Sequence, residues 1–172
     1  MNQAVEARQP DRPLRAMAGG DALKVLTFTV GGEILALAIS RVKEIIEYTD
    51  VTRIPMVPDY IRGVINLRGS VVPVIDLAAR LERPGGPTGR RTCVIIVELA
   101  EADGHLEVGI MVDAVNEVLD IAPGDVEPPP SFGASVRADF IEGMAKGKGG
   151  FTVVLNAARV LSLEELSDFG HA

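Results

Sequence analysis

The chain has 172 residues, a formal net charge of −7 and a hydrophobic fraction of 47%, which fits one ordinary globular domain or two very small ones. The acidic balance argues against nucleic-acid binding, because that binding depends on cations that neutralise phosphates. No apolar run approaches the roughly 20 residues of a membrane helix. Two histidines and one cysteine cannot assemble a His-rich metal site or an internal disulfide, so we expect no metal or other cofactor.

The first 22 residues contain Arg8, Arg12 and Arg15 but no apolar stretch behind them. We therefore expect a disordered tail rather than a secretory signal. Cys93 lies in an apolar run, where a thiol is more often a small buried group than a nucleophile. Cytoplasm is the simplest compartment for such a chain.

The first half of the chain predicts short strands, because runs rich in β-branched residues are interrupted by Gly and Pro. Pro73 lies inside one of these runs and cannot donate to a ladder, which places it at an edge or a bulge. A brief helical turn at 77–81 and a loop at 84–89 follow. The expected strands are residues 23–30, 33–39, 42–48, 64–67 and 71–77.

The second half repeats this theme and ends in the best helix candidate, residues 157–169, where apolar residues recur at helical spacing. Residues 128–130 are all proline and predict a stiff extended connection. His105 is expected in a hairpin turn rather than in a catalytic site. The expected strands are residues 93–99, 106–112, 115–121, 140–145 and 151–155.

The two halves can be aligned on each other. Residues 35–47 match 108–120 with a shift of about 73, and 71–78 match 151–158 with a shift of about 80. The alignment predicts two copies of a roughly 60-residue, five-stranded unit. Each copy is close to the size at which a single core is only marginally stable. We expect an all-β fold of two barrels that share a third apolar layer.

The repeat also separates residues by role. Positions that are alike in both copies are expected to serve the fold, as with Gly63 and Gly143, or Glu44 and Glu117. Positions that differ are freer to serve function. Arg68 is such a position, because the corresponding turn at 146–149 is flexible and cationic.

Residues 51–77, with Ile61-Arg62-Gly63-Val64-Ile65-Asn66-Leu67-Arg68-Gly69 at their centre, closely resemble the signature of CheW and CheW-like domains. Residues 28–47 are similar to the opening strands of that family, and residues 108–115 to its second barrel. The resemblance covers about 23–165.

The resemblance implies two SH3-like five-stranded β-barrel subdomains, with a short C-terminal helix and no active site. The domain would span 23–165, between tails at 1–22 and 166–172. Its subdomains would cover approximately 23–83 and 90–156, with strands near the termini free to cross between the barrels.

The resemblance also implies the partners of a chemotaxis adaptor. Such a protein bridges the cytoplasmic tip of a methyl-accepting chemoreceptor and the regulatory domain of the histidine kinase CheA, at the inner face of the membrane and without inserting into it. The implied receptor surface includes Val42, Glu44, Gly63, Arg68, Gly69 and Val94. The implied kinase contact lies around Glu127, Pro130 and Phe132.

Three of these residues have a structural alternative. Arg68 either meets acidic or carbonyl groups of a receptor or pairs with a neighbouring carboxylate. Glu44 serves either binding or the fold, and Phe132 either anchors an interface or plugs a barrel mouth.

Three other functions are compatible with a fold of this kind. A chain of 172 residues leaves no room for a kinase or receiver domain, so a free-standing adaptor is expected. A CheW-like adaptor of another array, one that drives pili or development, is the alternative. A small enzyme with a carboxylate site at Asp76, Asp113 and Glu117 is the remote one.

Overall fold

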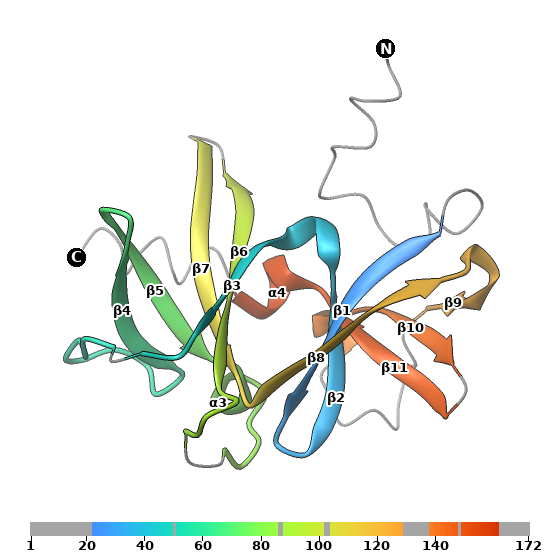
Figure 1. Ribbon diagram of the computed structural model, residues 1–172, viewed down its shortest axis with the longest axis horizontal. Helices are drawn as coiled ribbons and strands as arrows, with labels where there is room; N and C mark the ends of the chain where they lie inside the picture. Colours follow the sequence, from blue (N-terminus) through green and yellow to red (C-terminus); the bar gives the residue numbers. More distant parts are fainter. Residues whose placement is uncertain are drawn as a thin grey trace.

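The computed structural model describes residues 22–49, 51–85, 88–101, 104–128, 138–147 and 149–161. These residues form mainly strands, arranged in two sheets that lie beside each other (Figure 1). The all-β prediction is confirmed. The first sheet has the order β3-β6-β7-β5-β4, and its strands are Val42–Glu47 (β3), Cys93–Glu101 (β6), Gly104–Val112 (β7), Ser70–Asp76 (β5) and Ile61–Leu67 (β4).

The second sheet is built on the same plan with one short strand more. Its order is β8-β1-β2-β11-β10-β9, and its strands are Ala114–Ile121 (β8), Leu23–Val30 (β1), Glu33–Ala38 (β2), Gly150–Leu155 (β11), Ile141–Gly147 (β10) and Val126–Glu127 (β9). The helical elements are η1 (Ile39–Arg41), α3 (Leu77–Arg80), η2 (Pro123–Asp125), η3 (Ala138–Phe140) and α4 (Ala157–Leu161). Helix α4 begins as predicted, and the rest of the expected helix at 162–169 lies outside the described residues.

The two halves of the chain exchange their hairpins, so residues 23–83 and residues 90–156 each contribute strands to both sheets. The β1–β2 hairpin joins the second sheet by pairing with β8 and β11, and the β6–β7 hairpin joins the first by pairing with β3 and β5. Each exchanged hairpin is central in its sheet and apolar on both faces. Such strands need a sheet partner on either edge and an apolar layer on either side, and the neighbouring half supplies both.

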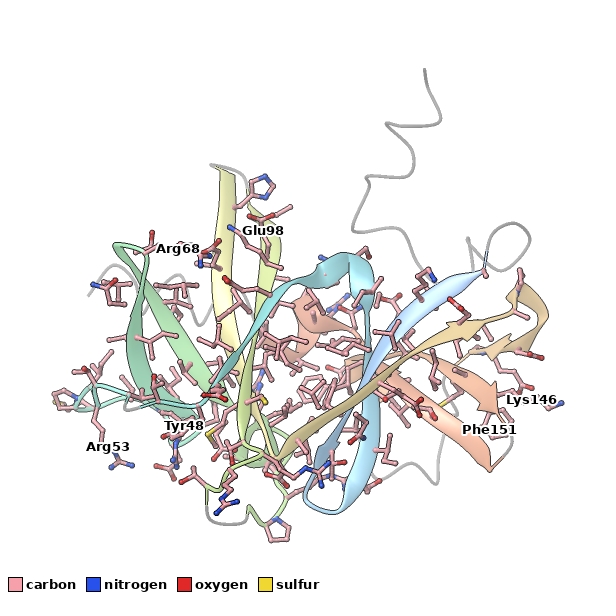
Figure 2. All side chains as sticks on the ribbon, in the orientation of Figure 1. Tyr48, Arg53, Arg68, Glu98, Lys146 and Phe151 are labelled. Atoms are coloured by element: carbon pink, nitrogen blue, oxygen red, sulfur yellow. The ribbon has the colours of Figure 1, made fainter. Side chains whose placement is uncertain are left out.

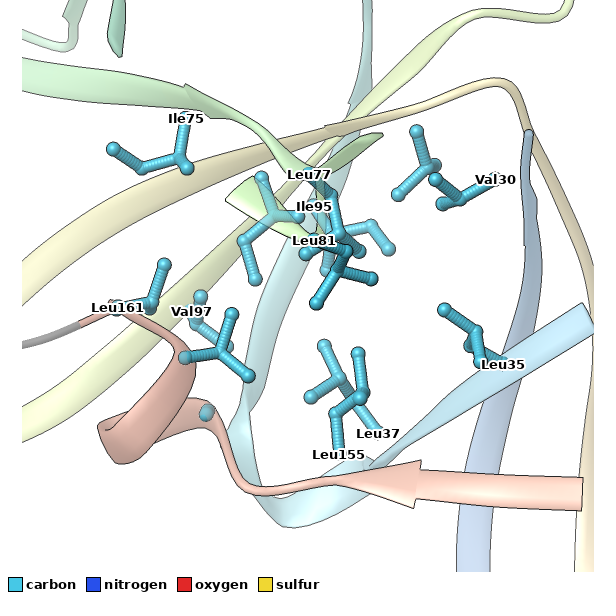
Figure 3. Packing of buried hydrophobic residues seen from close by; sticks show 14 of the residues in the cluster. Val30, Leu35, Leu37, Ile75, Leu77, Leu81, Ile95, Val97, Leu155 and Leu161 are labelled. Carbon is cyan, nitrogen blue, oxygen red and sulfur yellow. The ribbon is translucent and has the colours of Figure 1, made fainter. Parts of the chain in front are cut away.

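Three apolar clusters result from this exchange. One lies inside each curled sheet, built on Val25, Ala36 and Val154 in the second and on Val74, Val94 and Ile96 in the first. The largest lies between the sheets and draws side chains from both of them (Figure 3). We call it the shared cluster. It is the third apolar layer that the repeat predicted.

Strand β6 shows how one run of sequence serves two of these clusters. Val94 and Ile96 point into the first sheet's own cluster, whereas Ile95 and Val97 point into the shared cluster. Because successive side chains of a strand face opposite sides, a strand buried on both faces is continuously apolar. The edge strand β3 instead alternates half-buried and exposed residues.

Candidate functional site

Three of the six residues predicted to bind a receptor, Glu44, Arg68 and Gly69, lie together at the turn that joins β4 and β5. Arg68 and Gly69 form the two central positions of this turn, with φ of 52° and 90°. Two consecutive left-handed residues match the twist of a tight β-hairpin. The side chain of Asn66 accepts a hydrogen bond from the N–H of Gly69 at 2.9 Å, so the tip has a defined shape.

Arg68 pairs with Glu44, another residue of the predicted surface. The guanidinium donates from Nη1 to Oε1 at 3.0 Å and from Nη2 to Oε2 at 2.6 Å, a bidentate contact. Strands β3 and β4 are the two edges of the first sheet, so the Glu44–Arg68 pair links one edge strand to the hairpin that contains the other. The Arg68 side chain remains 64% exposed, against 26% for Glu44.

The electrostatics of this pair favour the charged form of both groups. The hydrogen bond to Glu44 raises the pKa of Arg68, and the same hydrogen bond lowers the pKa of Glu44. Both side chains therefore stay ionised at neutral pH, and Arg68 presents a permanent cation at the tip. In the structure Arg68 thus pairs with a neighbouring carboxylate, which is one of the two roles that the sequence left open for it.

A second ion cluster, which the sequence analysis missed, lies beside the first. Lys43 donates to Glu107 of β7, and its Nζ lies 3.8 Å from a carboxylate oxygen of Glu98 on β6. The bond to Glu107 raises the pKa of Lys43. Figure 2 shows Arg68 and Glu98 at the same end of the sheet. The sequence feature that could have indicated this cluster is the presence of Glu98 and Glu107 inside the otherwise apolar strands β6 and β7.

Gly63 is buried and serves the packing of the first sheet. A Cβ on this residue would lie 2.1 Å from the carbonyl oxygen of Thr52, and its φ of +146° excludes most other residues. Thr52 can come this close because it exchanges two hydrogen bonds of 2.9 Å with Val64. The repeat predicted such a structural role for Gly63.

The other two predicted receptor residues are less accessible than Arg68. Val94 is 1% exposed and lies in the first sheet's own cluster, so its side chain is not available at the surface. Val42 is partly buried against the shared cluster. The receptor contacts of all six residues stay predictions.

The predicted kinase contact falls at the edge of the second sheet. Glu127 ends β9, is exposed, and pairs with Met144 of β10. Pro130 and Phe132 lie outside the described residues. This part of the site also stays a prediction.

Two of the three carboxylates of the enzymatic alternative, Asp76 and Asp113, serve the fold. Asp76 accepts a hydrogen bond from the N–H of Ala79 at 3.3 Å and caps α3. Asp113 accepts from the N–H of Gly31 at 2.9 Å and braces the β1–β2 turn. Asp76 and Asp113 are engaged with main chain at different places, and Glu117 is exposed on β8.

Other chemistry-bearing groups give no site in the described part of the chain. Burial raises the pKa of the Cys93 thiol, which makes it a weaker nucleophile at neutral pH. His105 is exposed at the start of β7. The residues that the structure describes contain no group of three or more His, Cys, Asp or Glu able to hold a metal ion, and none of their helices is long and apolar enough to cross a membrane.

Residues 24–165 match the family described as the CheW-like domain. The chain belongs to this family. It is 34% identical over 142 residues to the chemotaxis protein CheW of Klebsiella aerogenes, which covers 83% of each chain. It is 36% identical to the CheW of Bacillus subtilis, covering 82% of this chain and 88% of that one.

Among solved structures, the scaffolding protein TtCheW from Thermoanaerobacter tengcongensis superposes with a TM-score of 0.72 at 33% identity. The match covers 80% of this chain and 86% of TtCheW. These findings confirm the predicted CheW family and its fold of two small β-barrels. They support a chemotaxis adaptor over the alternatives that the sequence left open.

Proposed function

We propose that this chain is a non-catalytic scaffold that couples methyl-accepting chemoreceptors to the histidine kinase CheA. Its CheW relatives are named chemotaxis proteins, and its structural neighbour is named a scaffolding protein. The engagement of Asp76 and Asp113 with main chain supports a protein that works by binding. It would act in the cytoplasm, within receptor arrays at the inner face of the membrane.

The observation that carries the receptor side of this proposal is the exposed, fixed guanidinium of Arg68. A guanidinium has five N–H donors, and the two hydrogen bonds to Glu44 leave others for a partner. Arg68 is 64% exposed on a turn of defined shape. A receptor helix that presents carboxylates or carbonyl groups would meet these remaining donors without reordering the side chain.

The rest of the receptor surface would be arranged around Arg68. Glu44 orients the guanidinium, Gly69 keeps the tip free of a side chain, and Val42 adds apolar contact beside the shared cluster. Gly63 and Val94 would shape the surface from beneath, because both are buried.

The kinase regulatory domain would bind separately, around Glu127, Pro130 and Phe132. Two distinct surfaces allow one adaptor to hold receptor and kinase at once, and an array raises their effective concentration. Receptor rearrangements would then reach the kinase through packed interfaces.

The test is CheA autophosphorylation in receptor-containing membranes, with and without this protein. We expect stimulation by the natural protein and its loss in Arg68→Glu, which repels Glu44 and reverses the charge at the tip. Arg159→Glu, at an exposed arginine of the second sheet's helix α4, is the matched control and should stimulate normally.

A charge swap separates receptor contact from a purely structural pair. In the double variant Glu44→Arg with Arg68→Glu, the ion pair can form again but the tip presents a carboxylate. If Arg68 itself contacts the receptor, the double variant stays inactive while its circular dichroism is unchanged. Recovery of full stimulation would show instead that only the ion pair matters, and the receptor role of Arg68 would be rejected.

A further inference from the structure

Strands β5 and β7 are neighbours in the first sheet but pair along only part of their length. The parallel ladder joins Val74, Ile75 and Asp76 to Gly109, Ile110 and Met111. Strand β5 starts at Ser70 and β7 at Gly104. Four residues of β5 and five of β7 therefore precede the ladder, and in the described part of the chain no strand pairs with their facing edges.

Pro73 explains why the ladder stops. Val64 exchanges hydrogen bonds with Thr52, so in its pair with Pro73 the main-chain groups of Val64 point away from β5. Those of Pro73 then face β7, and proline has no N–H to donate there. In the second sheet Val153 takes the place of Pro73 in the repeat, and it does pair across the corresponding ladder, with Leu35 of β2.

The open ends of the two strands line an open hollow of about 320 Å³. Continuing the register past the ladder would pair the lining residues of β5 with those of β7. These would-be pairs are Ser70 with His105, Val71 with Leu106, and Val72 with Glu107. Glu98, the register partner of Glu107 on β6, completes the lining.

The two sides of this hollow differ in chemistry. On the outer side are Val71, which is 71% exposed, and Leu106, which packs partly on the shared cluster. On the inner side are Glu107 and Glu98, and in the described part of the chain both share the ammonium group of Lys43. The lining thus combines an apolar side with an acidic side on which two carboxylates share one lysine.

We propose that this hollow receives an extended peptide strand from a partner protein, with side chains that alternate between apolar and cationic. An added strand would meet the N–H and C=O of Val71, which face the hollow because main-chain groups alternate along a strand. Its side chains would alternate likewise. Those on the outer side would contact Val71 and Leu106, and those on the inner side would approach Glu98 and Glu107. This surface adjoins the proposed receptor contact, because Ser70 directly follows Gly69, but it contains none of the residues assigned above to the receptor or the kinase.

The probe is a blocked eight-residue peptide in which lysine and valine alternate, titrated into the isotope-labelled full chain. We expect amide chemical shifts to change at residues 70–72 and 104–108, with slower hydrogen exchange of the Val71 amide. A peptide in which glutamate and valine alternate is the control and should leave these signals unchanged. Equal binding of the two peptides, or shifts confined to other residues, would overturn the proposal.

Variants of the hollow test the hydrogen bonds and the charge separately. Val71→Pro removes the N–H that faces the hollow without removing a bond to β4, and we expect binding to weaken by about tenfold or more. Val71→Thr keeps both N–H and shape, and should bind as the natural chain does. Glu98→Gln should weaken binding by a few-fold and lower its salt dependence. If Val71→Pro fails to fold, hydrogen exchange of the Val71 amide in the natural chain, measured with and without the peptide, tests strand addition instead. Unchanged exchange at saturating peptide rejects strand addition.

Discussion

The two sheets of this protein share one construction and differ at one end. In the first, the N–H of Asp76 bonds the carbonyl of Tyr60 at 2.7 Å, and in the second the N–H of Asn156 bonds that of Phe140 at the same distance. Both first hairpin strands carry a register shift at the same place, before Gly63 and before Gly143. The residues that the copies keep in common are those that close the turns and bend the strands.

The difference lies at the tips of the hairpins. The first sheet has Arg68 paired with Glu44, Lys43 paired with Glu107, and β5 parted from β7 above Pro73. At the corresponding place the second has a Gly-rich turn after Lys146 and the exposed Phe151 (Figure 2). The two copies therefore share the turns and the strand bends of their sheets. They differ at the hairpin tips, and the tips carry the candidate binding groups.

The largest expected effect tests whether the two sheets are one folding unit. Leu37 belongs to the second sheet but is 1% exposed in the shared cluster. Leu37→Ala should lower the free energy of unfolding by about 2–5 kcal/mol. Hydrogen exchange should show this loss for the slowest amides of both sheets.

Ile34→Ala, on the same strand but at a side chain 57% exposed, should change stability by less than about 0.5 kcal/mol. Loss of protection in the second sheet alone would mean that the sheets unfold independently despite their exchanged hairpins.

The next effect concerns a glycine that the first sheet requires. Gly63→Ala should lower the free energy of unfolding by about 2–4 kcal/mol, because the new Cβ would meet the Thr52 carbonyl. Gly150→Ala is the control in the second sheet, with φ of +122° but nothing within 4 Å of the added Cβ; about 1 kcal/mol is expected there. Urea unfolding of the two variants measures both values. Equal losses would show that φ, and not the contact with Thr52, makes Gly63 necessary.

A smaller effect tests the equivalence of the two sheets directly. Asp76 and Asn156 each accept a hydrogen bond from a main-chain N–H three residues later, at 3.3 Å and 3.1 Å. Replacing either by alanine should cost about 1 kcal/mol, by the same thermal or urea measurement. A much larger loss for Asp76 would show that this carboxylate does more than cap α3.

The smallest effect tests the parting of β5 from β7. Pro73→Val gives the first sheet the residue that the second has at this position, and the new N–H faces β7. We expect the ladder to lengthen toward Val108, with little change in stability. Protection of the residue 73 amide from hydrogen exchange would show this. Fast exchange there would mean that the hollow is held open by its charged lining and not by proline.

Much of the fold could be predicted because its signals are local. The β-branched runs, the turn at Arg68 and Gly69, and the helical turn after Asp76 each depend on a few neighbouring residues. The repeat predicted the structural role of Gly63 and the shared cluster. It did not predict which sheet each hairpin joins, because the apolar strands β1, β2, β6 and β7 suit a central position in either one.

The candidate site was predictable in its residue types and not in its contacts. Family resemblance pointed to Glu44 and Arg68 without indicating that they pair, and it included Val94, which is buried. No sequence motif connects Lys43, Glu98 and Glu107. Lys43 is more than 50 residues from both glutamates, and the two glutamates lie on opposite sides of a turn.

The strand content, the duplication, the family and a structural role for Gly63 could be inferred from the sequence, because periodicity and backbone preference act over short distances. The hairpin exchange, the Glu44–Arg68 pair and the hollow between β5 and β7 became visible in the folded chain alone. Those features arise where segments distant in the chain meet, and their geometry depends on how the shared cluster packs the two sheets together.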